Sequence, residues 1–377
     1  MNIAVDLRSL QSGRLSGVEN YTLNLLDALL AMDKENRYTL FSNRFLGQSR
    51  PALADNFHFI NAKTVRARYP NRLLNLGLML RAVRLESLTG DFEVLFMPNL
   101  NQFNIRSSAK LAITVHDLSP VITPEYYDVK RNLWHKLLGF KRAFARADLI
   151  FAVSEYTKLD LIRLFKIPEQ KIRVIYPGID QKIFQPKIPV ERLRAARNAY
   201  GLPGDYILFL NTIEPRKNLS GLLRAYELLR HPTDLVIVGR KGWKFRAIFR
   251  EIAASKKSAH IKYIGYLEER DKPAVISLAR GLVYPSFYEG FGFQPLEAMA
   301  CGVPVLASQA TSLPEVAGGA ALLADPHNPD DIRRGIELLL TNESLRERLI
   351  AKGLEWVKKY TWQKTADQVL AGLNGLK

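Results

Sequence analysis

The sequence contains a single cysteine, Cys301, among 377 residues. One cysteine cannot form a disulfide within the chain, and such low usage is typical of a reducing compartment. No uninterrupted apolar run is long enough to cross a bilayer. The amino-terminal MNIAVDLRSL is interrupted by Asp6 and has no basic segment before its apolar run, so it does not resemble a signal peptide. We therefore expect a cytoplasmic protein.

Several catalytic and metal-binding motifs are also missing. The sequence has no D-x-D, so a metal bridging a nucleotide diphosphate is not indicated, and it has no HExxH motif or cysteine–histidine cluster that would bind zinc. It has no G-x-S-x-G nucleophile elbow either. We therefore expect an activity that requires no metal or other cofactor.

Positive charge is in excess: 54 lysines and arginines stand against 37 acids, a formal net charge of +17. Residues 56–85 contain one acid-free basic cluster and residues 129–147 another. Such fields favour anionic partners, namely phospholipid surfaces, polyphosphates or nucleic acid. The first cluster is interleaved with apolar residues, which fits either an amphipathic helix on a membrane or a core-facing helix with a solvated basic face. The residues assigned to a membrane or acceptor side are Arg66, Arg68, Arg72, Arg81 and Arg84.

Short apolar runs alternate with amphipathic helical stretches throughout the chain, a pattern that is typical of parallel α/β folds. One series of strand candidates is interrupted by a proline-punctuated stretch, PGIDQKIFQPKIPVERL, after which a second series begins. The candidates are residues 2–7, 38–42, 94–98, 111–117, 149–154 and 172–178, and then 206–211, 234–239, 261–266, 281–286, 303–308 and 320–325.

This punctuation predicts two doubly wound, Rossmann-like domains, at residues 1–185 and 186–359. The segment 360–377 is predicted to be a helix that packs back on the amino-terminal domain. Ligands of open parallel sheets bind outside the carboxyl ends of the strands. We therefore expect the two domains to face each other across a cleft.

The most informative stretch is EGFGFQPLEAMACG, residues 289–302. Pro295 suits the first position of a helix, and Gly302 suits the left-handed position just past its end. Glu297 is then predicted in the first helical turn, with Glu289 in the glycine-rich turn before it. The start of a helix offers free N–H groups and a positive dipole end, which together favour an anion.

Further polar residues follow other predicted strands. Arg216 and Lys217 come after 206–211 at the start of a helix, where two fixed cations suit a diphosphate. His116 lies at the carboxyl end of the candidate strand 111–117 and can hydrogen-bond a sugar hydroxyl or a phosphate, although a lone histidine is often structural. Gly17 closes a Ser/Gly turn after the first strand, which is by itself a weak phosphate-loop signal.

With these residues in hand, the chain resembles glycosyltransferase family 4, a family with the two-domain GT-B fold. The resemblance covers nearly the whole chain. Within the family, the chain is most similar to the bacterial mannosyltransferase-like group. It implies a retaining, metal-independent transfer from a nucleotide-diphosphate sugar. The motifs that carry it include SGVENYTLNLL, VHDLSP, ARADLIFAVSEYTKLDL, NTIEPRKNLSGLLRAY and YPSFYEGFGFQPLEAMACGVPVLAS.

The resemblance also implies roles for single residues. Arg216 and Lys217 would neutralise the leaving diphosphate, Glu289 would hold donor-sugar hydroxyls and Glu297 would hold the ribose. His116 would lie near the reacting carbon. The remaining donor contacts implied are Gly17 at the diphosphate, backbone N–H groups around Phe291, Gly292 and Phe293, and backbone contacts of Tyr266 and Leu267 near the base.

The best-supported expectation is transfer of mannose from GDP-mannose to a lipid-linked glycan in O-antigen or exopolysaccharide synthesis. The enzyme is then expected on the inner face of the cell membrane, with the basic amino-terminal domain toward the leaflet. Without an evident enzymic nucleophile, retention suggests front-face attack. A UDP-hexose donor and a soluble sugar acceptor stay open. A basic nucleic-acid-binding protein is a distant alternative, since no known module for it is present.

Overall fold

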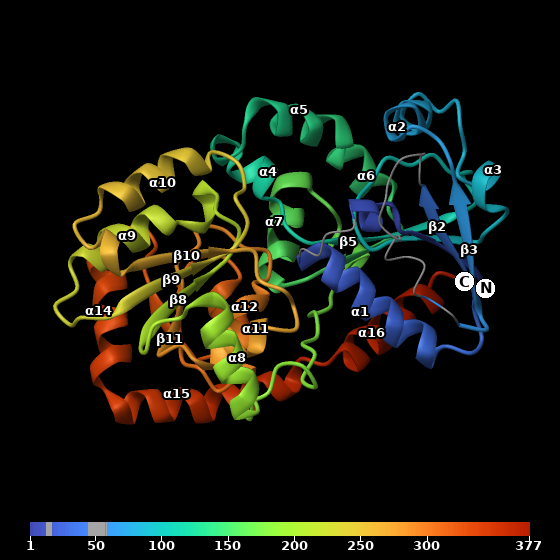
Figure 1. The fold of residues 1–377 in the computed structure, drawn as a ribbon. Coiled ribbons are helices and arrows are strands. Elements are labelled where there is room, and N and C mark those ends of the chain that lie inside the picture. Colours follow the sequence, from blue (N-terminus) through green and yellow to red (C-terminus); the bar gives the residue numbers. More distant parts are fainter. Residues whose placement is uncertain (13–16, 44–56, 58) are drawn as a thin grey trace. The chain divides into compact units, whose positions relative to one another are not determined.

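The computed structural model describes residues 1–12, 17–43, 57 and 59–377, which form two compact units (Figure 1). The first unit contains residues 1–118, 133–178 and 360–377, and the second contains residues 119–132 and 179–359. In the linker, the chain passes from the first unit to the second between residues 178 and 179. The boundary predicted from the sequence lies a few residues later, between 185 and 186. Part of the predicted Ser/Gly turn, residues 13–16, lies outside the described residues.

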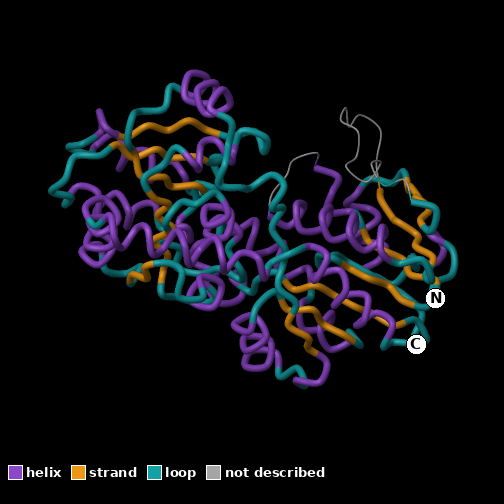
Figure 2. The backbone as a smooth tube through the Cα atoms, turned by 90° about the horizontal axis from the view of Figure 1, so that it is seen from below, coloured by secondary structure: helices purple, strands orange, loops and turns teal. Residues whose placement is uncertain are grey.

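The first unit is built on a seven-stranded parallel sheet in the order β3-β2-β1-β4-β5-β6-β7. Figure 2 shows its strands between helices. Its strands are β1 (Asn2–Asp6), β2 (Arg37–Asn43), β3 (Ala62–Ala67), β4 (Val94–Met97), β5 (Lys110–Val115), β6 (Leu149–Ala152) and β7 (Ile172–Val174). Its helices are η1 (Arg8–Ser12), α1 (Gly17–Met32), α2 (Asn71–Met79), α3 (Glu86–Thr89), α6 (Phe140–Arg146), α7 (Glu155–Phe165), η4 (Glu169–Lys171) and α16 (Trp362–Asn374).

The second unit repeats this winding in a six-stranded parallel sheet, β10-β9-β8-β11-β12-β13. Its strands are β8 (Tyr206–Leu210), β9 (Asp234–Val238), β10 (Ile261–Gly265), β11 (Gly281–Tyr284), β12 (Val305–Ser308) and β13 (Leu322–Ala324). Its helices are α4 (Ser119–Ile122), η3 (Pro124–Tyr126), α8 (Val190–Tyr200), η5 (Pro215–Lys217), α9 (Leu219–Glu227), α10 (Phe245–Ala254), η6 (Ser258–His260), α11 (Lys272–Ser277), α12 (Phe293–Ala300), α13 (Leu313–Ala317), α14 (Pro329–Thr341), α15 (Glu343–Trp356) and η7 (Val357–Lys359). Helix α5 (Val129–Leu138) begins in the second unit and ends in the first.

The central strands of both sheets are apolar along their whole length because helices cover both of their faces. Every residue of β4, β6, β8, β11 and β12 is buried. Each sheet changes its winding direction once, between β1 and β4 in the first unit and between β8 and β11 in the second. At such a switch point the loops leave in opposite directions and open a crevice at the carboxyl ends of the strands.

Two local features differ from the sequence prediction. Strand β3 was not predicted, because AKTVRA lies at the sheet edge and carries exposed polar residues instead of a continuous apolar run. Residues 119–132 belong to the second unit, although the sequence placed them in the first. The reason is aromatic packing: the ring of Tyr127 stacks on Trp243 at 5.1 Å, and Tyr126 stacks on Phe287 at 5.6 Å.

The last helix, α16, packs against α1 in the first unit. The side-chain amide of Asn36, just after α1, donates to Asn374 at 3.1 Å. The chain enters this helix by passing very close to the linker: a Cβ atom on Gly178 would lie 2.2 Å from the backbone nitrogen of Trp362. This close approach explains why a glycine stands at that point of the linker.

Candidate active site

The second sheet's switch point holds a cluster of charged side chains. Arg216 and Lys217 lie in η5 after β8, and Glu289 follows β11. The Lys217 ammonium donates to both oxygens of the Glu289 carboxylate, at 2.7 and 2.8 Å. The Arg216 guanidinium lies 3.3 Å from the same carboxylate and donates to the Tyr288 carbonyl at 2.7 Å. The structure thus brings Arg216 and Lys217, which follow one predicted strand, together with Glu289, which follows another.

This cluster is buried and electrically balanced. A fourth member, Glu214, accepts from Arg216 at 3.0 Å, so that two cations face two carboxylates. Burial alone would raise the pKa of Glu289, but Lys217 and Arg216 outweigh it and lower that pKa to about 2. Glu289 is therefore a fixed negative charge across the physiological range. Glu214 was not predicted, although its place in the motif EPRK was a signal.

Thr311 and Ser312, the two residues before α13, hydrogen-bond the glycine-rich turn. The Ser312 hydroxyl donates to the carbonyls of Glu289 and Phe291, at 2.9 and 3.1 Å. The backbone N–H of Glu289 donates to the Thr311 hydroxyl at 3.0 Å. Gly292 has φ of 93°, a value that side chains disfavour, and it caps the start of α12. The turn is thus rigidly placed at the switch point.

Helix α12 begins earlier than the sequence predicted. Its first residue is Phe293, so Pro295 is the third helical residue and not the first. Glu297 is then the fifth residue and lies beyond the first turn, which corrects the predicted position. The helix begins at Phe293 because Gly292 takes a left-handed conformation and is the N-cap residue. Gly302, with φ of 73°, does occupy the left-handed position past the helix end, as predicted.

Glu297 has a partner that the sequence did not reveal. The ammonium of Lys272, at the start of α11, lies 2.8 Å from both carboxylate oxygens. Both side chains are buried. Burial raises the pKa of Glu297 against the pull of Lys272, and nearby Glu269 adds to this effect. Burial disfavours the charged Lys272, but the two carboxylates outweigh it and raise its pKa. No motif signals this pair because it joins elements 25 residues apart.

The remaining predicted donor contacts of the second unit lie at neighbouring strand ends. Tyr266 follows β10 and is exposed, and the guanidinium of Arg240, which follows β9, lies 4.8 Å from the centre of its ring. Leu267 is buried. Phe291 and Phe293 pack edge-to-face at 5.3 Å. Arg240 is therefore a further cation at this edge that the sequence analysis missed.

In the first unit, His116 follows β5 and Gly17 begins α1. Nε2 of His116 lies 2.8 Å from the Pro98 carbonyl, and Tyr21 packs edge-to-face on the imidazole at 4.7 Å. Because a carbonyl can only accept, Nε2 carries a proton. Burial lowers the pKa of His116, so Nδ1 is a hydrogen-bond acceptor near neutral pH. The imidazole therefore has a fixed tautomer.

The predicted basic helix differs from the observed segment. Helix α2 ends at Met79, and Arg81 takes a left-handed conformation with φ of 61°, so the predicted helix does not continue to Arg84. Arg66 lies on the edge strand β3, Arg68 follows that strand and Arg72 lies in α2. Leu74 and Leu78 of this helix are buried, whereas other leucines of it are exposed. These basic residues therefore surround a short helix with apolar side chains on two faces.

In the part of the chain that the structure describes, no group of three or more histidine, cysteine, aspartate or glutamate side chains is placed to hold a metal ion. Within the same residues, no helix has both the length and the apolar character needed to span a bilayer.

Comparison with known proteins identifies the family. The Glycosyltransferase Family 4 model matches residues 15–182, and the Glycosyl transferases group 1 model matches residues 195–356. The O-antigen chain mannosyltransferase B of Escherichia coli is 37% identical over 261 residues, which cover 68% of each protein. The serotype-specific mannosyltransferase WbdA of Escherichia coli is 33% identical over 273 residues, 71% of this chain but only 34% of WbdA.

A solved structure supports the same fold. The sucrose-phosphate synthase of Thermosynechococcus elongatus superimposes with a TM-score of 0.76 at 22% identity, covering 100% of this chain and 99% of that one. At that identity the likeness concerns the fold alone. Together with the two parallel sheets, it confirms the predicted GT-B class of two Rossmann-like domains. The chain belongs to glycosyltransferase family 4, and it is a glycosyltransferase.

Proposed function

We propose that the protein transfers mannose, with retention, from GDP-mannose to a lipid-linked glycan in O-antigen or exopolysaccharide synthesis, and that it needs no metal. The similarity to two mannosyltransferases supports the sugar, and the name of one of them, O-antigen chain mannosyltransferase B, supports the pathway. The observation that carries the chemistry is the buried cluster of Arg216, Lys217 and Glu289 at the switch point. There, fixed cations take over the charge-neutralising work that a metal ion does elsewhere.

The cluster suits a departing diphosphate. When the glycosidic bond breaks, negative charge develops on the phosphate, and a positioned donor lowers the barrier by about 3 kcal/mol. Arg216 and Lys217 are held within reach of a ligand at this edge by Tyr288 and Glu289. A carboxylate accepts about four hydrogen bonds, so Glu289 can keep Lys217 in place while it also accepts donor-sugar hydroxyls.

Retention by front-face attack fits the same geometry. A double displacement needs a carboxylate nucleophile, but Glu289 is paired with two cations and its pKa is about 2. Such a carboxylate is a weak nucleophile. The leaving phosphate is then the base that takes the acceptor's proton. His116, with Nδ1 as acceptor, would orient a donor-sugar hydroxyl instead of protonating the substrate.

A nucleotide-sugar panel tests the donor. At a concentration of about 100 Kd, a ligand that binds only the folded state stabilises it by about 2.7 kcal/mol. We expect GDP-mannose to raise the melting temperature more than UDP-glucose or UDP-galactose, with or without EDTA. NMR of the product should show the α configuration of the donor. Stabilisation by a UDP-sugar alone would overturn the donor assignment, and an inverted product would overturn the mechanism.

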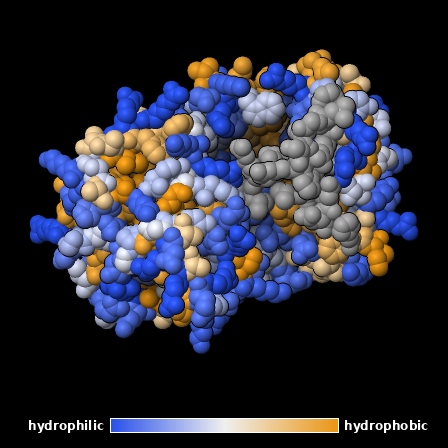
Figure 3. Space-filling model, viewed as in Figure 1, coloured by the Kyte–Doolittle hydropathy of each residue, from blue (hydrophilic) through white to orange (hydrophobic). Residues whose placement is uncertain are grey.

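Membrane binding is the second part of the proposal, and two exposed apolar helices support it. In α5 no side chain is buried, and Val129, Leu133, Trp134 and Leu137 are 86%, 58%, 47% and 48% exposed. In and beside α2, Tyr69, Leu73, Leu76 and Leu80 are exposed as well. Figure 3 shows hydrophobic residues scattered among hydrophilic ones along the edge of this face that carries the two helices. Exposed apolar side chains among basic ones, with no acid between residues 129 and 147, match an anionic lipid surface.

A chain of hydrogen bonds connects these two helices inside the first unit. The guanidinium of Arg8, buried against Asp6 at 2.6 Å, donates to Asn75 of α2 at 3.2 Å and to the Gln102 carbonyl at 2.6 Å. The side chain of Gln102 in turn donates to the carbonyl of Leu137 in α5. Arg8 and Gln102 therefore link α2 to the end of α5 that lies in the first unit, which includes Trp134 and Leu137.

Vesicle sedimentation tests this part. We expect binding to vesicles that contain phosphatidylglycerol, weaker binding at high salt because charge is screened, and little binding to neutral phosphatidylcholine. Replacing Trp134 and Leu137 by serine should weaken binding. Leu164→Ser, on an exposed leucine of α7, is the matched control and should bind normally. Binding that ignores lipid charge, salt and both α5 substitutions would refute the membrane assignment.

A further inference from the structure

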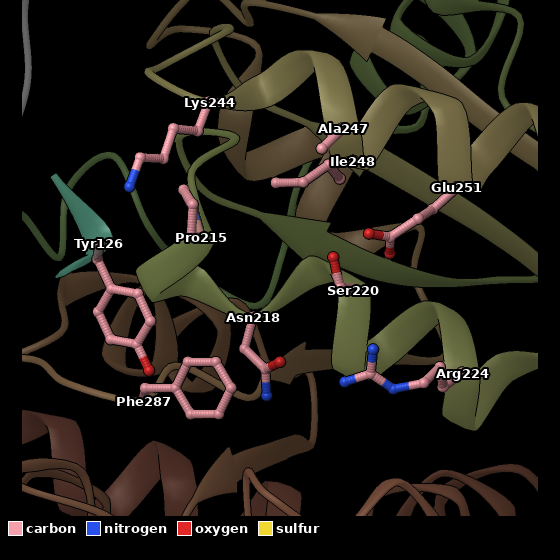
Figure 4. Close-up of a pocket in the computed structure, with 10 residues that line it drawn as sticks. All are labelled: Tyr126, Pro215, Asn218, Ser220, Arg224, Lys244, Ala247, Ile248, Glu251 and Phe287. Carbon is pink, nitrogen blue, oxygen red and sulfur yellow. The ribbon is translucent and has the colours of Figure 1, made fainter. Parts of the chain in front are cut away.

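A cavity lies in the second unit, beside the charged cluster. It has a volume of about 310 Å³ and opens between α9, α10 and the η3 segment (Figure 4). This size is at the lower end of small-molecule sites, which span about 300–1,000 Å³. Pro215 and Asn218 line it, whereas Arg216 and Lys217 between them do not, so the cavity adjoins the charged cluster but does not include its charged side chains.

The cavity offers hydrogen-bonding groups of both kinds. Ser220 and Arg224 lie one helical turn apart on α9, and Glu251 projects from α10 on the other side. In Figure 4 the ends of these three side chains point into the same space. Among the described residues, the side chains of Arg224 and Glu251 form no ion pair, and both are exposed. Their donors and acceptors are therefore available to a ligand.

The rest of the cavity is apolar and aromatic. Ile248 and Ala247 of α10 and Pro215 form apolar parts of its wall. Phe287 stands at the side, with its ring stacked on Tyr126 at 5.6 Å and nearly parallel. An apolar surface beside a few convergent polar groups is the usual design of a site for a small polar molecule.

The charges decide which molecule fits. A phosphate would bind Arg224 but would be repelled by Glu251, and the ammonium of Lys244 is engaged with the Glu125 carbonyl at 2.6 Å. A purely apolar ligand would cover the three polar groups of Ser220, Arg224 and Glu251 without offering any of them a hydrogen bond. A hexose meets both demands: its neighbouring hydroxyls both donate and accept, and its C–H face packs on apolar surface.

We propose that this cavity is a glycan-binding site that holds one hexose unit of the growing polysaccharide away from the reaction centre. Arg224 donates to sugar hydroxyls, Glu251 accepts from them, and the apolar wall of Pro215, Ala247 and Ile248 contacts the apolar face of the ring. The inference rests on the proposed function in that the acceptor is a growing glycan. Such a site retains the chain between successive transfers, which lengthens the product.

Titration with mannotetraose and maltotetraose, followed by ligand-observed NMR without donor, tests the site. We expect the wild-type protein to bind at least one of them, and Arg224→Ala and Glu251→Gln each to weaken that binding at least about tenfold. Both positions are exposed, so the variants should fold. Arg250→Ala, on an exposed residue of α10 outside the cavity, is the matched control. Transfer to a short acceptor should be unchanged in both cavity variants, while products on a long acceptor become shorter.

Three results would overturn the inference. The first is that neither tetrasaccharide binds. The second is binding that survives both cavity substitutions, which assigns it to another site. The third is inorganic phosphate bound in an Arg224-dependent way and tightened by Glu251→Gln, which would make the cavity an anion site. Tetrasaccharide binding that depends on Arg224 and Glu251, in a protein that does not use GDP-mannose, would uphold the inference while the donor assignment fails.

Discussion

The buried pair of Lys272 and Glu297 supplies the sharpest test of how this site is held together. Replacing Lys272 by methionine keeps the length and the apolar stem of the side chain but removes its charge. Glu297, whose side chain is 6% exposed, would then be a buried carboxylate without its cation at 2.8 Å. The other charged group near the Lys272 ammonium is the Glu269 carboxylate, at 3.7 Å. Because it is also an acid, it cannot neutralise Glu297 in the variant.

The magnitude follows from the geometry. At 2.8 Å and an effective dielectric constant of about 20, the attraction between the two charges is ~6 kcal/mol. Part of this is offset by the cost of desolvating both groups, and breaking a buried pair by removing one partner typically costs about 3–5 kcal/mol. We therefore expect Lys272→Met to lower the free energy of unfolding of the second unit by that amount near neutral pH.

The loss should depend on pH with a definite sign. The pKa of Glu297 is raised by burial in the folded state, so the folded protein binds this proton more tightly than the unfolded chain. The contribution of Glu297 to stability therefore falls as the pH rises from about 4.5 through the folded pKa. Removal of the Lys272 charge raises that pKa further. The cost of the substitution is thus smaller at about pH 5, where Glu297 becomes protonated, than at about pH 8.

Urea unfolding at both pH values measures these effects. Lys352→Met, on an exposed lysine of α15, is the matched control and should change stability little. The double variant Lys272→Met/Glu297→Gln should be more stable than the sum of the single losses implies, by at least about 1 kcal/mol, because it leaves no unpaired buried charge. Additive losses, or a Lys272→Met cost that is the same at both pH values, would refute the reasoning.

Three further predictions concern other parts of the molecule. Lys217→Ala should lower kcat by about 10²–10³, as loss of a transition-state donor does, whereas the exposed-lysine control Lys256→Ala should keep wild-type turnover in the same steady-state assay. Burial lowers the pKa of His116 below 6.5, so kcat/KM should stay level down to about pH 6.5 and fall only at lower pH. If His116→Asn shows the same fall of kcat/KM at low pH, His116 does not orient the donor sugar. Gly372→Ala should lower the free energy of unfolding in urea by about 1–3 kcal/mol, because the added Cβ would lie 2.6 Å from the Phe151 ring. Gly375→Ala is the control and should be tolerated, because its Cβ would lie 3.5 Å from the nearest atom. Equal costs would contradict the close contact between α16 and Phe151.

The alternation of apolar runs was enough to predict most of the fold, because the buried strands of parallel sheets are continuously hydrophobic. Residues 94–98 and 281–286, for example, enclose β4 and β11, in which every residue is buried. The edge strand β3 escaped prediction because its exposed Lys63 and Thr64 break that signal. The break at Arg81 escaped as well, since a left-handed arginine has no sequence signature comparable to a glycine.

For the site, the sequence predicted single residues better than their pairings. Arg216, Lys217 and Glu289 were found because they follow strands, and the order of the strands brings β8 and β11 together. The pairing of Lys272 with Glu297 depends on the packing of α11 against α12, which periodicity does not encode. Similarly, Arg240 meets Tyr266 only because β9 and β10 are neighbours. Long-range register, not residue type, is the information that was missing.

The observed pairings also change one argument about the cations. From the sequence, two cations at a helix start suit an anionic ligand, because the helix dipole disfavours unpaired cations there. In the structure Glu214 and Glu289 already meet this need, so Arg216 and Lys217 are stable without a ligand. The cost of bringing two cations into a buried site is therefore met during folding and not during substrate binding. A diphosphate arriving at this edge finds donors already in position, and preorganisation of this kind is what makes electrostatic catalysis effective.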